Sequence, residues 1–172
     1  IAVTAESLSY MPTIGFSVAA TTLVGQSLGA NDSEQAREYT KTAAFLGAAF
    51  MGLVAILFLV FPVPIVKFFN HEADIINVAA LCIRIAALEQ IPMALSMVLS
   101  GALKGAGDTK GTMYISLASN WLYRLPAAFI TVYVFKWSVA ALWYMTAIQY
   151  AIEAVLFGIR FKKGEWAGIA IQ

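Results

Sequence analysis

The sequence has few of the residues from which most catalytic and metal centres are built. Its 172 residues include one cysteine, Cys82, and one histidine, His71, which we predict to lie in a loop. A single cysteine excludes an internal disulfide and a cysteine metal cluster, and a lone loop histidine does not favour a histidine-based metal site. A membrane-embedded enzyme would need a nucleophile with its base, or a metal constellation. The sequence therefore predicts neither an enzyme nor a bound cofactor.

Charge is also scarce. Only 12% of the residues are charged and the net charge is +1, so no basic surface favours a nucleic-acid partner. Hydrophobic residues make up 60% of the chain and its mean hydropathy is +0.77. Soluble domains are about 45–50% apolar. This composition predicts an integral membrane protein that is in contact with lipid.

Long apolar segments fill most of the chain. About 20 residues at 1.5 Å rise cover roughly 30 Å of hydrocarbon, which is enough to cross a bilayer. The fold class that we predict is all-α, a polytopic transmembrane helix bundle. The chain opens at Ile1 with neither an initiator methionine nor a signal peptide, and five spans form an odd set, so we expect it to be a piece of a longer protein. The predicted helices cover about 8–30, 42–66, 75–104, 111–135 and 137–160.

Two local signals predict where helices begin and end. Asp32 or Ser33 is suited to cap the helix that follows the first polar connection. The glycines that begin at Gly105 favour a helix stop, because glycine tolerates the left-handed backbone that such a stop needs.

Positive charge is unequally divided between the two sides of such a bundle. If the first helix runs inward, the 31–41 and 105–110 loops and the C-terminus are cytoplasmic. The positive-inside rule favours this orientation, in a multi-pass protein of the cell (inner) membrane. The cytoplasmic side then holds Arg37, Lys41, Lys104, Lys110, Arg160, Lys162 and Lys163, and the outer side holds Lys67 and Lys136, with Arg84 near that surface.

Three ionisable side chains, Glu89, Arg124 and Glu153, fall near the middle of predicted spans. An ionisable group at that depth is costly in lipid, so we expect it to face a protein interior or an aqueous cavity. Helical spacing places each of the three on a polar or soft face of its helix. Glu89 shares its face with Met93, Ser96, Met97 and Ser100, Arg124 shares one with Thr112, Ser116 and Asn120, and Glu153 shares one with Thr146 and Gln149.

One hypothesis is that these faces line a common cavity. Arg124 would neutralise one carboxylate, and the other would exchange a proton or a cation. Alternatively, Arg124 forms a buried structural pair with Glu89 or with Glu153, which is a usual way for membrane interiors to hold charge. The Met and Ser face would then serve packing alone.

The first predicted helix, 8–30, is rich in small residues, which let membrane helices approach closely. Gln26 lies near its end, and it either bonds to a neighbouring helix or contacts a substrate. The residues from Gly25 to Asp32 and from Gly101 to Asp108 both read G-x-x-x-G-A-x-D. This similarity indicates either a repeated helix-pair unit or chance, because Gly and Ala are abundant here.

Several segments resemble transporters of the multidrug and toxic compound extrusion (MATE) family. Met11 to Ala30 resembles the eighth helix of these proteins, Ser100 to Lys110 the end of the tenth, and Trp121 to Pro126 the middle of the eleventh. The resemblance implies a twelve-helix antiporter of two lobes, of which this chain is five of the six helices of the C-terminal lobe. Its partners would be the missing N-terminal lobe, small organic cations and a coupling ion, H⁺ or Na⁺.

The sequence departs from the family pattern at one position. In one branch of the family an aspartate stands on helix ten about where Met93 stands here, and this chain offers Glu89 one turn earlier on the same face. In another branch the key acid lies in the first lobe. The coupling ion therefore stays open.

Two alternative functions also stay open. One is a lipid-linked precursor flippase of the same superfamily, and the other is a structural lobe without a transport site of its own. The substrate and ion pathway that we expect comprises Gln26, Glu89, Met93, Met97, Asn120, Arg124, Gln149 and Glu153.

Overall fold

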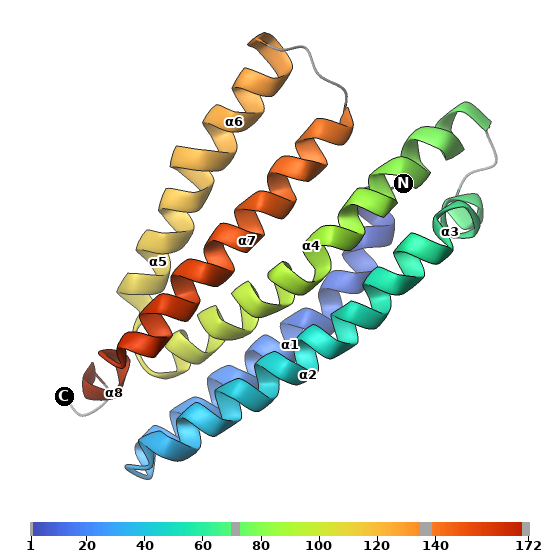
Figure 1. Ribbon diagram of the computed structural model, residues 1–172. Helices are drawn as coiled ribbons and strands as arrows, with labels where there is room; N and C mark the ends of the chain where they lie inside the picture. Colours follow the sequence, from blue (N-terminus) through green and yellow to red (C-terminus); the bar gives the residue numbers. More distant parts are fainter. Residues whose placement is uncertain (1, 70–72, 135–138, 170–172) are drawn as a thin grey trace.

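The computed structural model describes residues 2–69, 73–134 and 139–169, and every secondary-structure element in these ranges is a helix (Figure 1). This confirms the predicted all-α class. Among the described residues, Ser33–Val60, Ile75–Gly105 and Ala140–Lys163 are long and apolar enough to cross a membrane. The elements are α1 (Ala2–Gly29), α2 (Ser33–Val60), α3 (Pro62–Phe69), α4 (Ala73–Gly105), α5 (Thr109–Leu117), η1 (Ala118–Arg124), α6 (Leu125–Phe129), η2 (Ile130–Val134), α7 (Val139–Lys163) and α8 (Trp166–Ile169).

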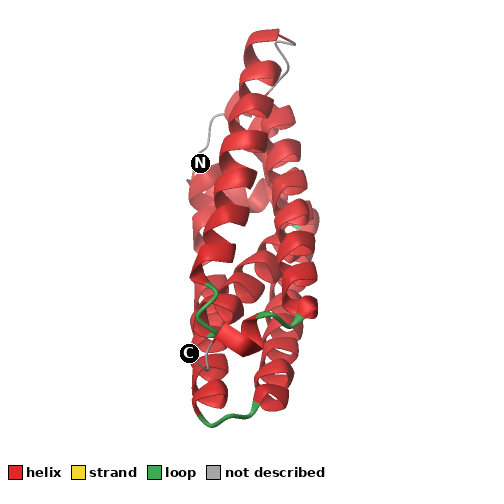
Figure 2. Cartoon of the chain, turned by 90° about the vertical axis from the view of Figure 1, so that its left-hand side faces the viewer, coloured by secondary structure: helices red, strands yellow, loops and turns green. Residues whose placement is uncertain are grey.

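Helix α4 is the centre of the bundle. It packs against α1 and α2 on one side and against α7 on the other (Figure 1). The view at 90° shows the long helices running along a common axis (Figure 2). Because α4 has neighbours on several sides, it buries side chains around much of its circumference, among them Ile83, Ala86, Met93 and Val98. A helix that is apolar nearly all round is typical of such an interior position.

The close contact between α4 and α1 depends on two glycines of α4. A Cβ atom at Gly101 would lie 2.5 Å from the Ser17 carbonyl oxygen, and one at Gly105 would overlap the carbonyl group of Thr21. The hydroxyl of Thr21 donates to the Gly101 carbonyl at 2.9 Å, and that of Ser17 donates to the Met97 carbonyl at 2.8 Å. Small residues and interhelical hydrogen bonds thus hold two membrane helices together where the hydrophobic effect cannot.

The two G-x-x-x-G-A-x-D sequences form the same turn. After α1 the Asp32 N–H donates to the carbonyl five residues earlier at 2.9 Å, and after α4 the Asp108 N–H does the same at 2.9 Å. The residue before each aspartate has a positive φ, 58° at Asn31 and 84° at Gly107, as a left-handed helix stop requires. The predicted helix stop after Gly105 is confirmed.

Each aspartate then caps the following helix. Asp32 accepts a hydrogen bond from the Gln35 N–H at 2.9 Å, and Asp108 accepts one from the Gly111 N–H at 3.1 Å. Side-chain oxygens at this position satisfy an N–H group that has no partner within the helix. The matching hydrogen bonds show that the α1–α2 and α4–α5 junctions share one local structure.

The structure divides the predicted second span, 42–66. Helix α2 begins earlier, at Ser33, and ends at Val60; α3 starts at Pro62. The boundary falls at Phe61, whose φ of −119° and ψ of 39° are not helical. A residue before proline is pushed away from helical backbone, which explains the break. His71 and residues 135–138 lie outside the described residues. The end of the predicted 111–135 helix and the start of the predicted 137–160 helix therefore lie outside them too.

The predicted 111–135 helix contains two wider π-helical segments, η1 and η2. At the end of η1 the Leu125 N–H donates to the Asn120 carbonyl, five residues back. Pro126 follows directly, and it lacks an N–H and crowds the carbonyl four residues earlier. The wider turn accommodates this proline.

Candidate functional site

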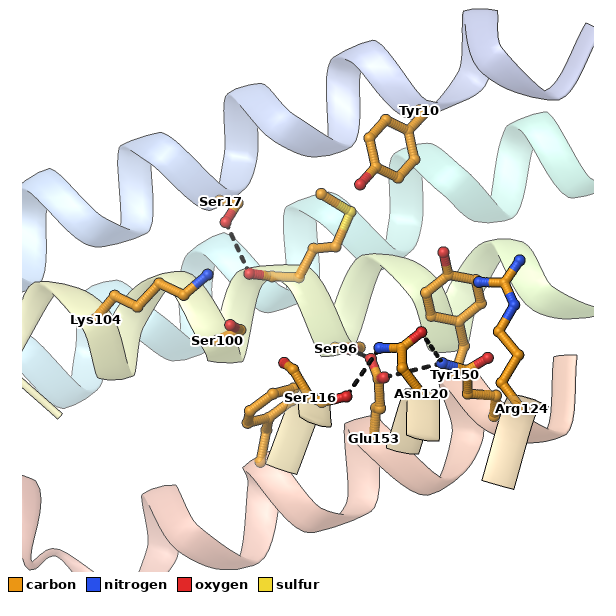
Figure 3. Close-up of a pocket in the computed structure, with 13 residues that line it drawn as sticks. Tyr10, Ser17, Ser96, Ser100, Lys104, Ser116, Asn120, Arg124, Tyr150 and Glu153 are labelled. Atoms are coloured by element: carbon orange, nitrogen blue, oxygen red, sulfur yellow. Dashed lines mark hydrogen bonds between the residues drawn. The ribbon is translucent and has the colours of Figure 1, made fainter. Parts of the chain in front are cut away.

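A polar pocket of about 230 Å³ lies between α1, α4, the α5–η1 helix and α7 (Figure 3). Four separate elements contribute to it, so it exists only in the folded bundle. Its walls combine hydroxyl, amide and charged groups with aromatic rings. The lining residues are Tyr10, Ser17, Ser96, Met97, Ser100, Lys104, Ser116, Asn120, Arg124, Gln149, Tyr150, Glu153 and Phe157.

The carboxylate of Glu153 stands at the centre of a hydrogen-bond network (Figure 3). Its Oε2 accepts a hydrogen bond from the Ser96 hydroxyl of α4 at 2.9 Å. Its Oε1 accepts one from the Gln149 amide, one turn earlier on α7, at 3.2 Å. Glu153 is only 7% exposed. A buried carboxylate needs such donors, because an unsatisfied charge in a low-dielectric interior is costly.

The network continues from α7 to η1. The Gln149 amide nitrogen also donates to the Asn120 Oδ1 at 3.3 Å, and the Asn120 amide donates to the Ser116 carbonyl at 2.8 Å. The Gln149 Oε1 is buried and has no hydrogen-bond partner among the described residues. An acceptor of this kind, beside a carboxylate, is suited to a cation or to a hydrogen-bond donor.

Two cationic side chains also line the pocket, Arg124 from η1 and Lys104 from the last turn of α4. Figure 3 shows them toward opposite ends of the pocket, with Glu153 between them. Arg124 forms no ion pair within the described part of the chain, so the alternative in which it pairs with Glu89 or Glu153 is not seen. The ion pair that the described residues do form is Asp108 with Arg160, outside this pocket.

The structure brings some of the predicted site residues together. Met97, Asn120, Arg124, Gln149 and Glu153 all line the pocket.

The other three predicted residues lie elsewhere. Glu89 is fully buried on α4 and is not among the described residues that line this pocket. Met93 packs in the interior against Met51 and Ala94. Gln26 is exposed in the last turns of α1, near the junction with α2.

Sequence reasoning missed some of the lining residues. Lys104 lies one turn beyond Ser100, which itself lies one turn beyond Ser96, so continuing the i, i+4 spacing would have found it. Tyr10 and Ser17 come from α1, and Tyr150 from α7. No spacing within α4 or α5 indicates these residues, because only the packing of α1 and α7 places them here.

The fold and the pocket together define a class: a polytopic helical membrane protein with a polar, charged pocket between its helices. A family model for MatE matches residues 1–130. The chain therefore belongs to the MatE family.

Similar proteins extend the comparison over nearly the whole chain. The probable multidrug resistance protein NorM of Thermotoga maritima is 33% identical over 171 residues, which are 99% of this chain and 37% of that protein. The multidrug resistance protein MdtK of Proteus mirabilis is 28% identical over 164 residues, 93% of this chain and 36% of that protein. The crystal structure of the eukaryotic MATE transporter AtDTX14 matches with a TM-score of 0.87 and 26% identity, covering 98% of this chain and 38% of that one. This chain thus spans less than two-fifths of the length of each of these relatives.

Proposed function

We propose that this chain is part of the C-terminal lobe of a MATE-type antiporter in the cell membrane, with five of the six helices of that lobe. The complete transporter, which includes an N-terminal lobe, would export organic and often cationic compounds in exchange for H⁺ or Na⁺. The names of the bacterial relatives, multidrug resistance proteins, support efflux as the function. The share of the relatives that this chain covers supports the view that a further lobe takes part.

The observation that carries the proposal is the Glu153 network in a pocket built by several helices. Hydrogen bonds connect this one carboxylate to Ser96 on α4 and to Gln149 on α7, and Gln149 in turn to Asn120 on η1. A proton on Glu153, or a cation bound by it and the Gln149 Oε1, would change which of these bonds form. The three helices would then prefer a different packing.

Coupling requires that ion and drug bind differently to the inward-facing and outward-facing states. A ligand shifts such an equilibrium only by its difference in affinity for the two states. Glu153 supports this requirement because it is bonded directly to Ser96 of α4 and, through Gln149 of its own helix, is linked to Asn120 of η1. Glu89 is a second candidate for ion exchange, since it is a fully buried carboxyl group one turn before Met93.

A transport assay with the complete transporter in proteoliposomes tests this function. We expect efflux of a fluorescent organic cation to depend on an imposed proton or sodium gradient. Glu153→Gln keeps the side chain's size and removes its charge, and we expect at least about a tenfold loss of gradient-dependent efflux, equivalent to about 1.4 kcal/mol.

Two further variants make the transport assay specific. Glu38→Gln is the matched control, because Glu38 is exposed on α2 away from the pocket, and it should transport normally. Glu89→Gln tests the second carboxyl group. Coupled transport that survives in Glu153→Gln but is lost in Glu89→Gln would move the ion site to Glu89. Transport that is independent of any gradient would contradict antiport altogether.

A further inference from the structure

The segment that follows α7, residues 164–169, turns back onto the bundle and contains α8; we call it the α8 segment. Figure 1 shows α8 at the end of the bundle that also holds the α4–α5 turn. Trp166 of this segment is 1% exposed and has the largest side chain among the fully buried described residues. A short segment is held in place when it buries so large an apolar side chain. Trp166 lies in one apolar cluster with residues from α1, α2, α4 and α7, among them Val24, Ala36, Leu103 and Phe161.

Two interactions join Trp166 to α7. Its ring stacks on the ring of Phe161, with the centroids 4.9 Å apart and an angle of 12° between the planes. Its indole Nε1–H donates to the Phe161 carbonyl at 2.7 Å. Carbonyl groups in the last turn of a helix have no N–H partner within the helix, so the indole caps the end of α7.

A third interaction joins Trp166 to α2. The guanidinium carbon of Arg37, in the second turn of α2, lies 5.2 Å from the centre of the indole ring. Among aromatic side chains, tryptophan forms the strongest contact of this kind with a cation. Helices α2 and α7 pack on different sides of α4. Trp166 therefore connects the two sides of the bundle at this end.

Gly164 forms the turn that brings Trp166 to Arg37. Its φ of 75° lies in the left-handed region that favours glycine, and its N–H donates to the Phe161 carbonyl at 3.3 Å. A Cβ atom at this position would lie 2.8 Å from Nη2 of Arg37. A larger residue would therefore strain the turn and displace the guanidinium from the indole.

Phe161 lies on the face of α7 that carries the pocket carboxylate. Gln149, Glu153, Phe157 and Phe161 follow one another at intervals of four residues, and all four are buried. Phe157 belongs to the same apolar cluster as Trp166 and also lines the pocket. Because these residues share one continuous helix, a rotation or shift of α7 at Phe161 also moves Glu153.

We infer that the α8 segment is a latch and that Trp166 is a positioning residue. By stacking on Phe161 and contacting Arg37, Trp166 fixes the rotation and depth of α7 against α4. Glu153 is thereby kept opposite Ser96, to which it is hydrogen-bonded. Trp166 is not among the described residues that line the pocket, so it acts through α7. The latch depends on contacts within this chain, and only its effect on transport rests on the proposed function.

Amide hydrogen exchange in the purified complete transporter, followed by mass spectrometry, tests the latch. The N–H groups of Gly164, Ala167 and Gly168 are hydrogen-bonded in the α8 segment. Trp166→Ala should raise their exchange rate at least about tenfold, because loss of the buried ring lets the segment open locally.

Three further variants make the exchange measurement specific. Arg37→Gln should raise the rate less than Trp166→Ala, because the stacking and the indole hydrogen bond remain, and Arg37→Lys, which keeps a cation, should restore a part of the protection. Trp121→Ala is the matched control, because Trp121 lies on η1 and is outside this apolar cluster. It should leave the exchange unchanged.

A cross-link between α4 and α7 reports the register of α7. A Cβ atom at Gly158 would lie 3.9 Å from Cδ1 of Leu99, and neither residue lines the pocket. In a complete transporter without other cysteines, Leu99→Cys and Gly158→Cys should form a disulfide on mild oxidation. We expect Trp166→Ala to slow this reaction at least about fivefold, because the two thiols are then within bonding distance less often. Trp166→Phe, which keeps a ring on Phe161, should restore most of the rate.

The exchange and cross-linking results decide the inference without reference to transport. Wild-type exchange in Trp166→Ala would overturn the latch, and so would exchange that rises equally throughout α1 and α4, which would indicate general destabilisation. Raised exchange with an unchanged rate of cross-linking would overturn the positioning of α7.

Transport then tests the link to Glu153. Gradient-dependent efflux by Trp166→Ala should fall at least about threefold, because a site loses function when its supporting residues no longer hold it in place. Normal efflux in a variant whose cross-linking is slowed would overturn this link. Efflux that is independent of a gradient in the wild-type protein would instead contradict the proposed function, and the other two measurements would still decide the latch.

Discussion

At the scale of single residues, the charged groups of this chain have three different surroundings. Glu153 is buried and hydrogen-bonded, Arg124 is exposed and has no charged partner in the described part of the chain, and Asp108 is buried in an ion pair. The same kind of residue therefore has different chemistry at different positions. Burial and partners determine which charges are available to a ligand and which serve the fold.

Asp108 joins the α4–α5 turn to the end of α7. Its carboxylate accepts hydrogen bonds from the Gly111 N–H and from the Arg160 guanidinium, one of them at 3.0 Å. Gly111 leaves room for this guanidinium, because a Cβ there would overlap Arg160. The hydrogen bond from Arg160 is the main reason that the pKa of Asp108 lies below its usual value.

This pKa shift predicts a pH dependence of stability. A carboxyl group with a lowered folded-state pKa stabilises the fold above its unfolded pKa of about 3.9, and that contribution is lost as the pH falls through the lower folded value. We expect Asp108→Asn, which keeps a capping oxygen, to lower the unfolding midpoint at pH 7 by the equivalent of about 1–3 kcal/mol. Thermal unfolding in detergent from pH 7 to pH 3 measures this.

The difference between Asp108→Asn and the wild-type protein should shrink as the pH falls below about 4, because the unfolded Asp108 then binds a proton that the folded Asp108 takes up only at its lower pKa. Asp32→Asn is the matched control. Asp32 caps α2 in the equivalent turn but is exposed and forms no ion pair within the described residues. A difference that stays constant down to pH 3 would contradict a role for the Asp108 charge.

At the scale of whole elements, the contact between α1 and α4 decides the position of one wall of the pocket. Gly101 and Gly105 allow the backbones to touch, so Ser17 of α1 reaches the pocket beside Met97 of α4. A larger residue at either glycine would separate the two helices. The width of the pocket therefore depends on Gly101 and Gly105, two residues that do not themselves line the pocket.

Gly105→Ala should destabilise the protein, because its new Cβ would overlap backbone atoms of Thr21 that cannot move aside as a side chain does. Overpacking of this kind costs about 1–3 kcal/mol. The unfolding midpoint of the complete transporter in detergent measures the loss. Gly15→Ala is the matched control, since a Cβ at Gly15 meets nothing within 4 Å and alanine favours a helix. Equal midpoints for both variants would contradict the tight α1–α4 contact.

At the scale of the whole molecule, the pocket is a property of the bundle and not of any one helix. Its residues come from α1, α4, the α5–η1 helix and α7. The apolar interior of α4 lies next to it and is closed, with Val98 and Met93 fully buried. A polar pocket and an apolar core therefore lie on different faces of one helix.

This arrangement predicts a pattern of cysteine labelling. In a complete transporter whose other cysteines have been replaced, the Ser116→Cys variant should react with a small hydrophilic thiol reagent, because Ser116 lines the pocket. The Val98→Cys variant and the native Cys82 should not react, because both positions are buried. Labelling followed by mass spectrometry measures this. Protection of the thiol in the Ser116→Cys variant, together with a reactive Cys82, would contradict the position of the pocket.

The sequence by itself determined the membrane class, the all-α fold, the helix stop after Gly105 and the choice of Asp32 or Ser33 as the cap of the next helix, of which the structure shows Asp32. These features depend on composition and on neighbours within a few residues, so periodicity and turn chemistry are enough to predict them. It also placed Asn120, Arg124, Gln149 and Glu153 on polar faces. A polar face, however, does not say which other face it meets.

Only the tertiary structure decided which of these side chains share a pocket. It put Glu153 beside Ser96 and Gln149, left Arg124 without a charged partner among the described residues, and placed Met93 in the interior. It also supplied Tyr10 from a helix that lies far earlier in the chain. The physical reason is that helical spacing fixes directions around a single axis, and the rotation and depth of one helix against another depend on the packing of side chains distant in sequence.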